Sequence, residues 1–441
     1  MRVFCAMLVL GCAATVASQL GRAADDVKKP EERVEAGKCQ SASATFVRRE
    51  SPDKAWQVVR ENDKLYTGDL IISGTQGALV SSNGDVRLSA MAAMTGISEF
   101  PIIETAVILH EPKDVDLDFT LDRGRVELVN LKKSGAARVR IRVGDHAAVM
   151  TLAEPGDRMV DEVYGRWPKG VHFKKNAKPD DGPAIAVLAM ALKGEIDIKG
   201  THHEVVLKAP PGPALLVMQN FGDHKTPVPE HMEHVPAWAK EGGRPDDDEK
   251  KLAAGKKFRE LAIKKSIPEA VDELAKSDSI DEQTLAVFIM GATDDLEKLG
   301  KTMQSTKHQE VWDAGVLALH HWIGRCPGQD QKLYDALLEK VKMKPVQAET
   351  VMDLLHTYGD DDLAKPETYE MLITYLQSDL LAVRGLAYWH LERLVPEGKK
   401  IGYSPLASKD ERDKAIHAWQ ELLPPGKLPA PPKGEGSKGS N

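Results

Sequence analysis

Residues 114–128 read DVDLDFTLDRGRVEL, and the fold expected for the first half of the chain follows from their pattern. Apolar and polar residues alternate strictly from Asp114 to Leu121, as in a β-strand with one buried and one solvated face. Comparable strand patterns, separated by turn signals, continue from residue 45 to residue 239. Asn83-Gly84 lies between two short apolar runs and predicts a tight hairpin. The sequence therefore predicts an antiparallel β-sandwich or barrel over residues 45–239.

A weak internal echo lies within this β region. Segment 121–128 is followed by segment 151–156, and segment 192–198 is followed by segment 206–212. In each pair a strand with a glycine near its start precedes a strand that a Pro-Gly turn ends. We interpret the two pairs as a duplicated β unit; coincidence of turn chemistry is the alternative.

Beyond a polar linker expected at residues 240–257, the apolar period changes from two residues to about 3.6. Apolar positions then recur in paired helices with a unit of about 36 residues, which is typical of a helical solenoid. We expect HEAT-like repeats over residues 258–423 and a disordered Pro/Gly-rich tail over 424–441. The expected inward positions are Val311, Gly315, Ala318, Leu319 and Trp322, then Val351, Leu354, Leu355 and Tyr358, then Val383, Ala387, His390, Leu391 and Leu394; the partner helices carry Tyr334, Leu337, Leu338 and Val341, then Tyr369, Leu372, Ile373 and Leu376.

The first 24 residues predict export. A basic start is followed by an uncharged run over residues 3–17 and by small residues. This is the layout of a secretory signal peptide, and the run is short for a membrane span, although an uncleaved anchor is an alternative. A lipoprotein is another alternative through Cys12, but Cys12 lies inside the apolar run rather than at its end. We expect a periplasmic or secreted protein whose residues 25–44 form a charged, flexible linker.

The composition excludes several classes of protein. The chain has 441 residues, 42% hydrophobic and 29% charged, which is typical of a soluble protein with two or three domains. A net charge of −8 gives no general attraction to phosphate backbones, so nucleic acid is not an expected partner. No later apolar run approaches the roughly 18 residues of a spanning helix, so no integral membrane span is expected after signal cleavage.

Two cysteines, Cys39 and Cys326, would remain after signal cleavage. They are too few for a disulfide framework, and although an oxidising compartment would permit them to pair, we expect them to stay free. Cys326 follows His320 and His321 in the sequence, but that proximity does not establish the geometry of a nucleophile and its base.

The carboxylate and histidine clusters do not form recognisable metal motifs. Asp114, Asp116 and Asp118 open like a calcium loop, but Phe119 stands where glycine is required and Arg125 where glutamate is required. We therefore expect a solvated strand face. Runs 246–248 and 360–362 are expected to be solvated aspartate loops, and the pair His231 and His234 has no third fixed ligand nearby.

The sequence contains no serine-nucleophile elbow, phosphate-binding loop or dinucleotide fingerprint. We therefore assign no catalytic, cofactor-binding or metal-binding residue and expect a non-catalytic protein without a cofactor. An enzyme of unknown class remains an alternative, because catalytic sites assemble in space.

Short motifs in the β half resemble those of FecR-type periplasmic domains. They are Leu65-Tyr66-Thr67-Gly68, Ala78, the hairpin at residues 83–88 and the Arg-Gly-Arg-Val core of residues 121–128. The resemblance covers roughly residues 60–160 and implies a β-sandwich in the cell envelope with an interaction role. Family members that signal to a sigma factor carry a cytoplasmic segment and a membrane helix, whereas here a signal peptide leads into the β region, so that role does not transfer. Segment 154–168 and the helical half resemble bacterial proteins that join such a domain to helices.

These features predict an exported interaction or scaffold protein that binds a protein partner of the cell envelope. The contact would use the β domain or the helical surface, since solenoids present extended faces and sandwiches present strand edges. Outward positions expected to serve the partner are Gln309, Glu310, Asp313, Arg384 and Glu392. The alternative is a polysaccharide-binding protein that uses Trp56, Tyr66, Trp167 and Trp238, with segment 164–168 as the densest aromatic spot.

Overall fold

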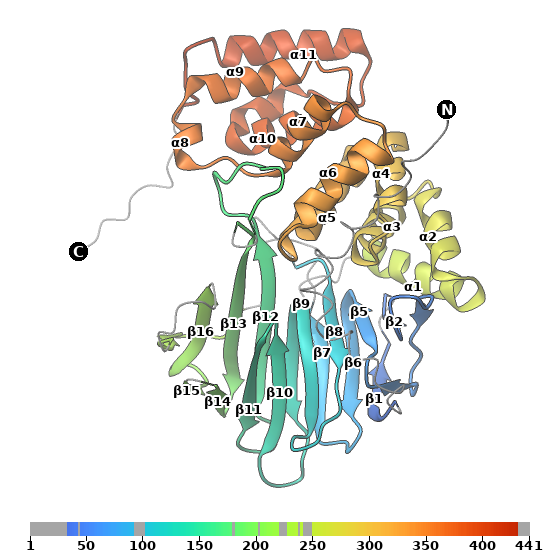
Figure 1. Ribbon diagram of the computed structural model, residues 1–441, viewed down its shortest axis with the longest axis vertical. Helices are drawn as coiled ribbons and strands as arrows, with labels where there is room; N and C mark the ends of the chain where they lie inside the picture. Colours follow the sequence, from blue (N-terminus) through green and yellow to red (C-terminus); the bar gives the residue numbers. More distant parts are fainter. Residues whose placement is uncertain are drawn as a thin grey trace, which may run out of the picture. The chain divides into compact units, whose positions relative to one another are not determined.

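The computed structural model describes residues 33–42, 45–91, 102–178, 181–201, 203–219, 227–236, 239–240 and 249–430. A β region is followed along the chain by a helical region, which confirms the coarse order expected from the sequence (Figure 1). The predicted signal peptide lies outside the described residues, as do Trp238 and the aspartates of 246–248. No helix of the described part is long and apolar enough to cross a membrane.

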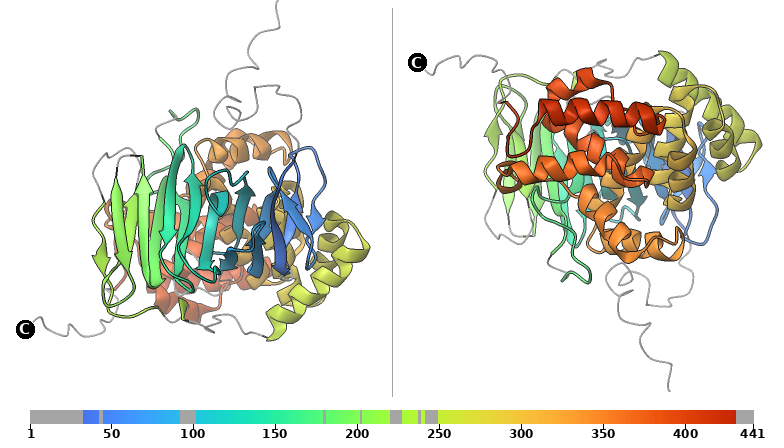
Figure 2. Two further views of the ribbon diagram at one scale, coloured as in Figure 1. Left: turned by 90° about the horizontal axis from the view of Figure 1, so that it is seen from below. Right: turned by 90° about the horizontal axis from the view of Figure 1, so that it is seen from above.

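The β region consists of strands that lie side by side from its blue to its light-green part (Figure 2). Their bounds are β1 (Glu35–Ser41), β2 (Val47–Arg49), β3 (Gln57–Val58), β4 (Lys64–Tyr66), β5 (Leu70–Ser73), β6 (Thr75–Ser81), β7 (Val86–Met91), β8 (Thr105–Leu109), β9 (Leu117–Asn130), β10 (Ala137–Val143), β11 (His146–Leu152), β12 (Arg158–Arg166), β13 (Ala184–Lys193), β14 (Glu195–Gly200), β15 (Glu204–Lys208), β16 (Pro213–Gln219) and β17 (Glu230–His231).

The strands form two sheets that share β9. Sheet A has the order β4-β1-β6-β7-β9-β12-β13-β16-β17, and sheet B has the order β3-β2-β5-β8-β9-β10-β11-β14-β15. Leu128 from sheet A and Phe119 from sheet B are both fully buried in the same hydrophobic core. The expected sandwich arrangement is therefore present, with one correction: β9 and β10 run parallel.

Gly124 lets β9 belong to both sheets. Residues 117–123 of β9 pair with β8 and β10, whereas residues 124–130 pair with β7 and β12. Gly124 has a φ of 92°, a conformation that favours glycine, and a side chain there would collide with the backbone of Glu104. The Arg-Gly-Arg step seen in the sequence is therefore the point at which the strand passes from one sheet to the other.

Two four-strand units follow the same path through the sandwich. In β9–β12 and again in β13–β16, the first and last strands pair in sheet A while the middle two form a hairpin in sheet B. The Pro155-Gly156 turn and the turn at Gly212 occupy equivalent places, as the duplication would require. Gly124 and Gly194 are not equivalent, because Gly124 lies inside β9 while Gly194 separates β13 from β14.

Three boundaries and environments differ from the expectation. β1 lies within the segment predicted as linker. The sequence did not reveal this strand because Ala36 and Cys39 are its only buried side chains and the others are polar. Helix α1 (Glu249–Lys264) begins inside the predicted 240–257 linker. Its first turns were missed because the face that the helix buries is made mainly of small residues, which give a weak apolar period. Asp118 is 1% exposed rather than solvated, since arginines of β10 neutralise it.

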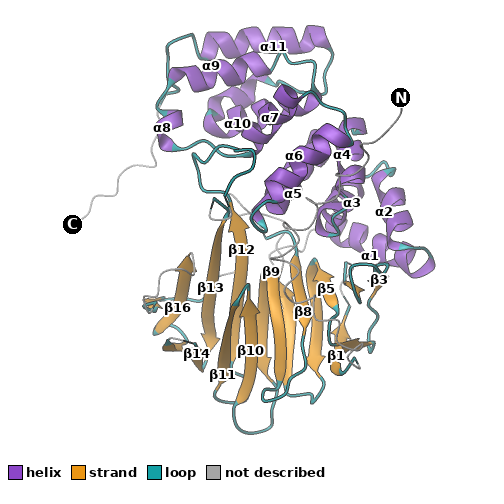
Figure 3. Ribbon diagram, viewed as in Figure 1, coloured by secondary structure: helices purple, strands orange, loops and turns teal. Residues whose placement is uncertain are grey.

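The helical region packs as neighbouring helix pairs (Figure 3). Its further elements are α2 (Ile267–Ala275), α3 (Ile280–Ala292), α4 (Leu296–Ser305), α5 (Gln309–Gly324), α6 (Gln329–Glu339), α7 (Pro345–Leu355), α8 (Asp360–Leu363), α9 (Pro366–Tyr375), α10 (Leu381–Leu394), the 3₁₀ helix η2 (Pro396–Ile401) and α11 (Lys409–Leu422). The aspartates of 360–362, expected in a loop, form the start of α8 because Asp362 caps the backbone N–H of Gly359.

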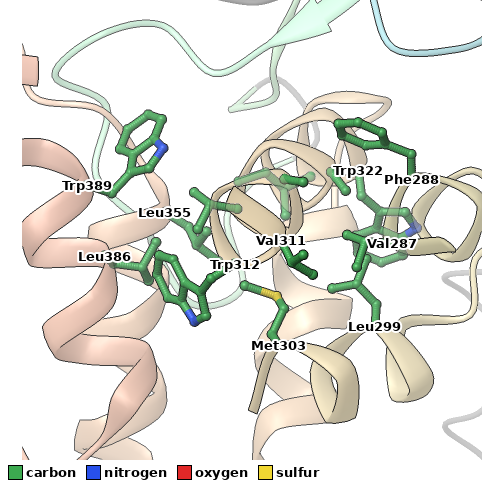
Figure 4. Close-up of a cluster of buried hydrophobic side chains, with 14 of the residues drawn as sticks. Val287, Phe288, Leu299, Met303, Val311, Trp312, Trp322, Leu355, Leu386 and Trp389 are labelled. Atoms are coloured by element: carbon green, nitrogen blue, oxygen red, sulfur yellow. The ribbon is translucent and has the colours of Figure 1, made fainter. Parts of the chain in front are cut away.

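The core of this region lies around α5. Trp312 and Val311 are buried there, with Met303 of α4 and Leu386 of α10 close by (Figure 4). A side chain at Gly315 would collide with Met303, so α4 and α5 approach each other closely at this inward glycine.

Most of the expected inward positions of α5, α7 and α10 are buried. Leu319 is the exception that matters, because it is only partly buried, whereas its counterpart Leu391 is fully buried.

Candidate functional site

The ends of three helices receive hydrogen-bond donors from the β region or from the segment that follows β12. The last carbonyl groups of a helix have no partner inside it, so they accept donors from elsewhere. Arg123 Nη2 of β9 donates to Ala292 O at the end of α3, at 2.9 Å. Trp167 Nε1 donates to Ile323 O at the end of α5, at 3.1 Å. Gly170 N donates to Thr357 O, just beyond α7, at 2.8 Å.

A buried ion cluster accompanies the first of these contacts. Glu104 is 5% exposed and receives the guanidinium groups of Arg123 and Arg325, with Arg325 Nη2 at 2.6 Å from Glu104 Oε1. Burial alone would raise the pKa of Glu104, but the two guanidinium groups outweigh it and hold the pKa at about 2. Arg325 also donates to Gly291 O and pairs with Asp294, so it joins the ends of α3 and α5 to Glu104, the residue before β8.

The segment that follows β12, residues 167–178, reaches the helices in Figure 1, and we call it the strap. Besides Trp167 and Gly170, the strap residue Asn176 is fixed, because its N–H donates to Gln331 Oε1 of α6 at 2.9 Å. Phe173 packs against Tyr334 with ring centroids 5.2 Å apart. Together with the ion cluster, these contacts fasten the sandwich to the helical region at widely separated points.

Gly165 and Gly324 allow β12 to approach α5 closely. A side chain on either glycine would collide with the backbone carbonyl group of the other. The Tyr-Gly-Arg-Trp-Pro motif, which begins at Tyr164, therefore has a packing role: its glycine removes a side chain so that Trp167 can reach the end of the helix.

His356 lies beneath the strap and faces Asp330 of α6. His356 Nδ1 is 2.8 Å from Val171 O, and since only a protonated ring nitrogen can donate to a carbonyl oxygen, Nδ1 carries the hydrogen. Burial lowers the pKa of His356 to about 4, so the ring is neutral at pH 7 and Nε2 is a bare acceptor. Asp330 Oδ2 lies 4.0 Å from this Nε2, and burial raises the pKa of Asp330.

A cavity of about 190 Å³ lies between the strap and Asp330. Trp167 and His172 of the strap line it, as do Lys174 and Asp181 near its exposed rim. The lining therefore combines an indole and an imidazole with carboxylate and ammonium groups, which are groups that small polar molecules bind.

Two further histidines lie nearby, of which His390 is buried and His320 is half-buried. His320 stacks on Trp389 with ring centroids 4.9 Å apart, and burial together with neighbouring imidazoles lowers its pKa to about 3. His390 Nε2 is 2.7 Å from Leu354 O in the last turn of α7, and burial lowers its pKa to about 4. Both are neutral packing residues at pH 7.

The residues considered from the sequence are dispersed. Within the described residues, no group of three histidine, cysteine, aspartate or glutamate side chains could hold a metal ion. His231 and His234 are exposed on and beside the short edge strand β17. Cys39 and Cys326 are both free, and burial raises the pKa of each thiol, which disfavours the thiolate of a nucleophile.

The aromatic residues do not form an exposed platform in the described part of the chain. Trp167 is 9% exposed and is bonded to α5, and Trp56 is half-buried with Arg49 stacked 4.6 Å from its ring centroid. Tyr66 is also half-buried. The aromatic residues at 164–168 do lie at a contact between distant parts of the chain, but Trp167 there binds α5 and is not exposed to a sugar.

Several expected outward positions have structural partners. Arg384 Nε donates to Pro405 O at 2.7 Å, and Arg384 Nη1 donates to Asp379 O at 2.9 Å. Asp313 accepts a hydrogen bond from Gln309, and burial raises its pKa to about 6. Glu310 is exposed as expected.

Sequence reasoning missed Asp330 and His356. No local motif marks them, since they lie on different helices and meet only after folding. The nearest sequence signal was the Trp-Pro pair at 167–168, which starts the strap above them.

Comparison with protein-family models, curated proteins and solved structures gives no match to this chain. The function must therefore be argued from the contacts described above.

Proposed function

We propose that the chain is an exported, non-catalytic scaffold protein of the cell envelope that binds a protein partner through its helical surface. The proposal includes a signal peptide at residues 1–24, a FecR-like β domain and a HEAT-like helical domain. Glycines of the FecR-like motifs support the β assignment, because Gly68 and Gly84 lie in turns with φ of 84° and 82°. The successive packing of α5, α6, α7 and α10 supports the repeat assignment.

The observation that carries the proposal is the fastening of the sandwich to the ends of α3, α5 and α7. Buried ion pairs and the strap hold both regions in one arrangement, so a partner would meet a surface that is already ordered. A preorganised surface binds more tightly because less conformational entropy is lost on association. Glu310 at the start of α5 is exposed on that surface, so its charge can be reversed without disturbing the core.

The proposal can be tested by affinity capture from envelope extract followed by quantitative binding of the retained protein. Glu310→Lys should weaken retention of that partner while leaving the melting temperature unchanged. Glu204→Lys on β15 is the matched control, since Glu204 is equally exposed but lies on the sandwich. A loss of binding in Glu204→Lys alone would move the partner to the β domain, and no specific retention by the unchanged chain would contradict the proposal.

A further inference from the structure

Strand β15 lies at an edge of sheet B, where it pairs with β14 alone among the described strands. Two bonds flank this pairing, from Gly200 N to His203 O and from Ala209 N to Gly194 O, each at 2.9 Å. Because hydrogen-bonded pairs alternate along an antiparallel ladder, the odd-numbered residues of β15 bond to β14 and the even-numbered ones turn their N–H and C=O groups outward. Within the described part of the chain, the strand therefore presents a row of outward donors and acceptors that another strand can pair with.

The side chains on these outward residues complement a second copy of the same strand. They belong to Glu204, Val206 and Lys208, and all three are exposed, with Val206 38% exposed between the two charges. In an antiparallel pairing about a two-fold axis at Val206, Glu204 lies opposite the partner's Lys208, and Val206 lies opposite the partner's Val206. Both charged pairs then have opposite signs, and the two valines cover each other.

Other registers lose this match. A shift of two residues in either direction places a charged residue of one copy opposite Val206 of the other. A shift of one residue places the outward backbone groups opposite residues that already bond to β14, and it turns the matching side chains to opposite faces. The charge pattern of β15 therefore selects one register for pairing with itself.

Charges on β14 extend the complementarity beyond the two edge strands. Lys199 Nζ lies 3.5 Å from Glu204 Oε2, and Lys208 Nζ lies 3.0 Å from Glu195 Oε2. In the paired copies, a row formed by Lys199 and Glu204 continues into the partner's Lys208 and then its Glu195. The signs alternate across four neighbouring strands, and the two-fold axis repeats the row on the other side of the paired valines.

The backbone contact is short, which limits its strength. A side chain at Gly212 would lie 3.1 Å from Lys208 O, so the turn after β15 lies close to that carbonyl group. The pairing therefore rests on two bonds between the Val206 residues and two from Lys208 N to the partner's Glu204 O. Such a contact buries less than the roughly 1,200–2,000 Å² of a stable interface, and we expect a dissociation constant on the order of 10–100 µM.

We propose that two copies of this chain associate edge to edge through β15 and form a dimer in which sheet B continues from one copy into the other. The same strand serves both copies, so the contact is closed and association stops at the dimer. The contact lies on the sandwich and does not involve Glu310. The dimer and the binding of a protein partner can therefore each fail without the other.

Sedimentation equilibrium of the purified full chain at pH 7, from about 1 to about 500 µM, tests the proposal. The average mass should rise from that of one chain toward that of two. Lys208→Glu places like charges opposite each other at both ends of the contact and should weaken association about tenfold or more. Lys64→Glu is the matched control, since Lys64 is 61% exposed on the edge strand β4 and pairs with Glu35 of the next strand, and it should associate as the unchanged chain does.

A double variant separates the contact between chains from effects within one chain. Lys208→Glu combined with Glu204→Lys restores opposite charges across the two-fold axis but sets like charges beside Lys199 and Glu195 within each chain. Its association should return to within about threefold of that of the unchanged chain. Val206→Pro removes an outward N–H group without removing a bond to β14, and it should abolish the dimer.

Circular dichroism checks that each variant is folded. The proposal is overturned if the chain stays monomeric at about 500 µM, or if Lys208→Glu associates as tightly as the unchanged chain. It is also overturned if the double variant associates no better than Lys208→Glu alone, since the charges would then not meet across the axis. A mass beyond that of two chains contradicts it as well, because a closed contact cannot continue.

Discussion

The β region and the helical region bury ionisable groups in opposite ways. In the sandwich, Asp118 is almost fully buried as a carboxylate, with Arg140 Nη1 at 3.0 Å and Arg142 Nη2 at 2.8 Å from its Oδ2. In the helical region two buried imidazoles are neutral instead, and His356 and His390 each bond a backbone carbonyl oxygen. The two solutions follow from the backbone geometry on which each group sits.

Neighbouring strands place side chains of one face about 5 Å apart, so a buried charge can find its opposite on the next strand. On a helix the i+3 and i+4 neighbours of a buried side chain lie on the same apolar stripe, whereas the last carbonyl groups of the helix lack partners. Donors therefore collect at helix ends, where His390 meets Leu354 O and Trp167 meets Ile323 O. The junction of the regions uses both devices, because Arg325 pairs with Glu104 and also donates to Gly291 O.

The largest effect should come from removing the cation of that junction. Arg325→Ala leaves Glu104 buried with one partner fewer and removes the bond to α3, so we expect a loss of about 3–5 kcal/mol in the free energy of unfolding. Differential scanning calorimetry should also show a broader transition, since the sandwich and the helices would then be joined only by Arg123 and the strap. Lys340→Ala, on the exposed end of α6, should stay within about 0.5 kcal/mol. A single transition at an unchanged temperature in Arg325→Ala would show that the junction does not couple the regions.

A smaller effect should distinguish two positions that the repeat pattern treats as equivalent. Leu391 is fully buried, so Leu391→Ala should cost about 3 kcal/mol through lost burial and the cavity left behind. Leu319 is only partly buried, so Leu319→Ala should cost about 1 kcal/mol. Urea denaturation of both variants measures the difference. Equal losses would mean that the two repeats pack alike in solution.

The different burial of Leu319 and Leu391 shows which features of the fold could be predicted from the sequence. Periodicity identified the strands, the Asn83-Gly84 hairpin and the helical positions, because these patterns reflect local geometry. It treated Leu319 and Leu391 alike because burial also depends on which distant element covers a position. It also missed β1, whose few apolar residues gave no period.

The candidate site was less predictable than the fold. Asp330 and His356 meet through the packing of two helices and the strap, and no spacing in the sequence records such a meeting. The Trp167 contact with Ile323 O joins residues more than 150 positions apart, where local patterns carry no information.

The third prediction concerns the pH dependence of stability that the buried imidazole of His390 contributes to the helical region. The pKa of His390 is lowered to about 4 from 6.5, so the folded protein binds fewer protons than the unfolded chain between these values. Its contribution to stability is present above pH 6.5 and is lost as the pH falls toward 4, with a size on the order of 2–3 kcal/mol. Urea denaturation between pH 4 and 7 should show a free energy of unfolding that rises with pH. His390→Gln should make this rise less steep, by the equivalent of about one proton bound on unfolding. The control His231→Gln makes the same substitution at an exposed histidine of β17. The comparison of the regions is wrong if His390→Gln has the same slope as the unchanged chain.

The smallest effect concerns Asp161, a buried carboxyl group of the sandwich for which no cationic partner is seen among the described residues. Asp161 is 2% exposed in β12, its Oδ2 has no hydrogen-bond partner in the described structure, and burial raises its pKa to about 8. The folded protein therefore binds more protons than the unfolded chain between pH 3.8 and 8, so stability should fall as the pH rises through this range. Asp161→Asn removes the ionisable group while keeping its shape, and we expect it to raise the free energy of unfolding on the order of 1–2 kcal/mol at pH 8 and to change little at pH 4. Asp118→Asn is the matched contrast, because it deprives Arg140 and Arg142 of a carboxylate and should destabilise the protein at both pH 7 and pH 8. If Asp161→Asn also destabilises the protein at pH 8, Asp161 has a partner in solution and is not an unpaired buried carboxyl group.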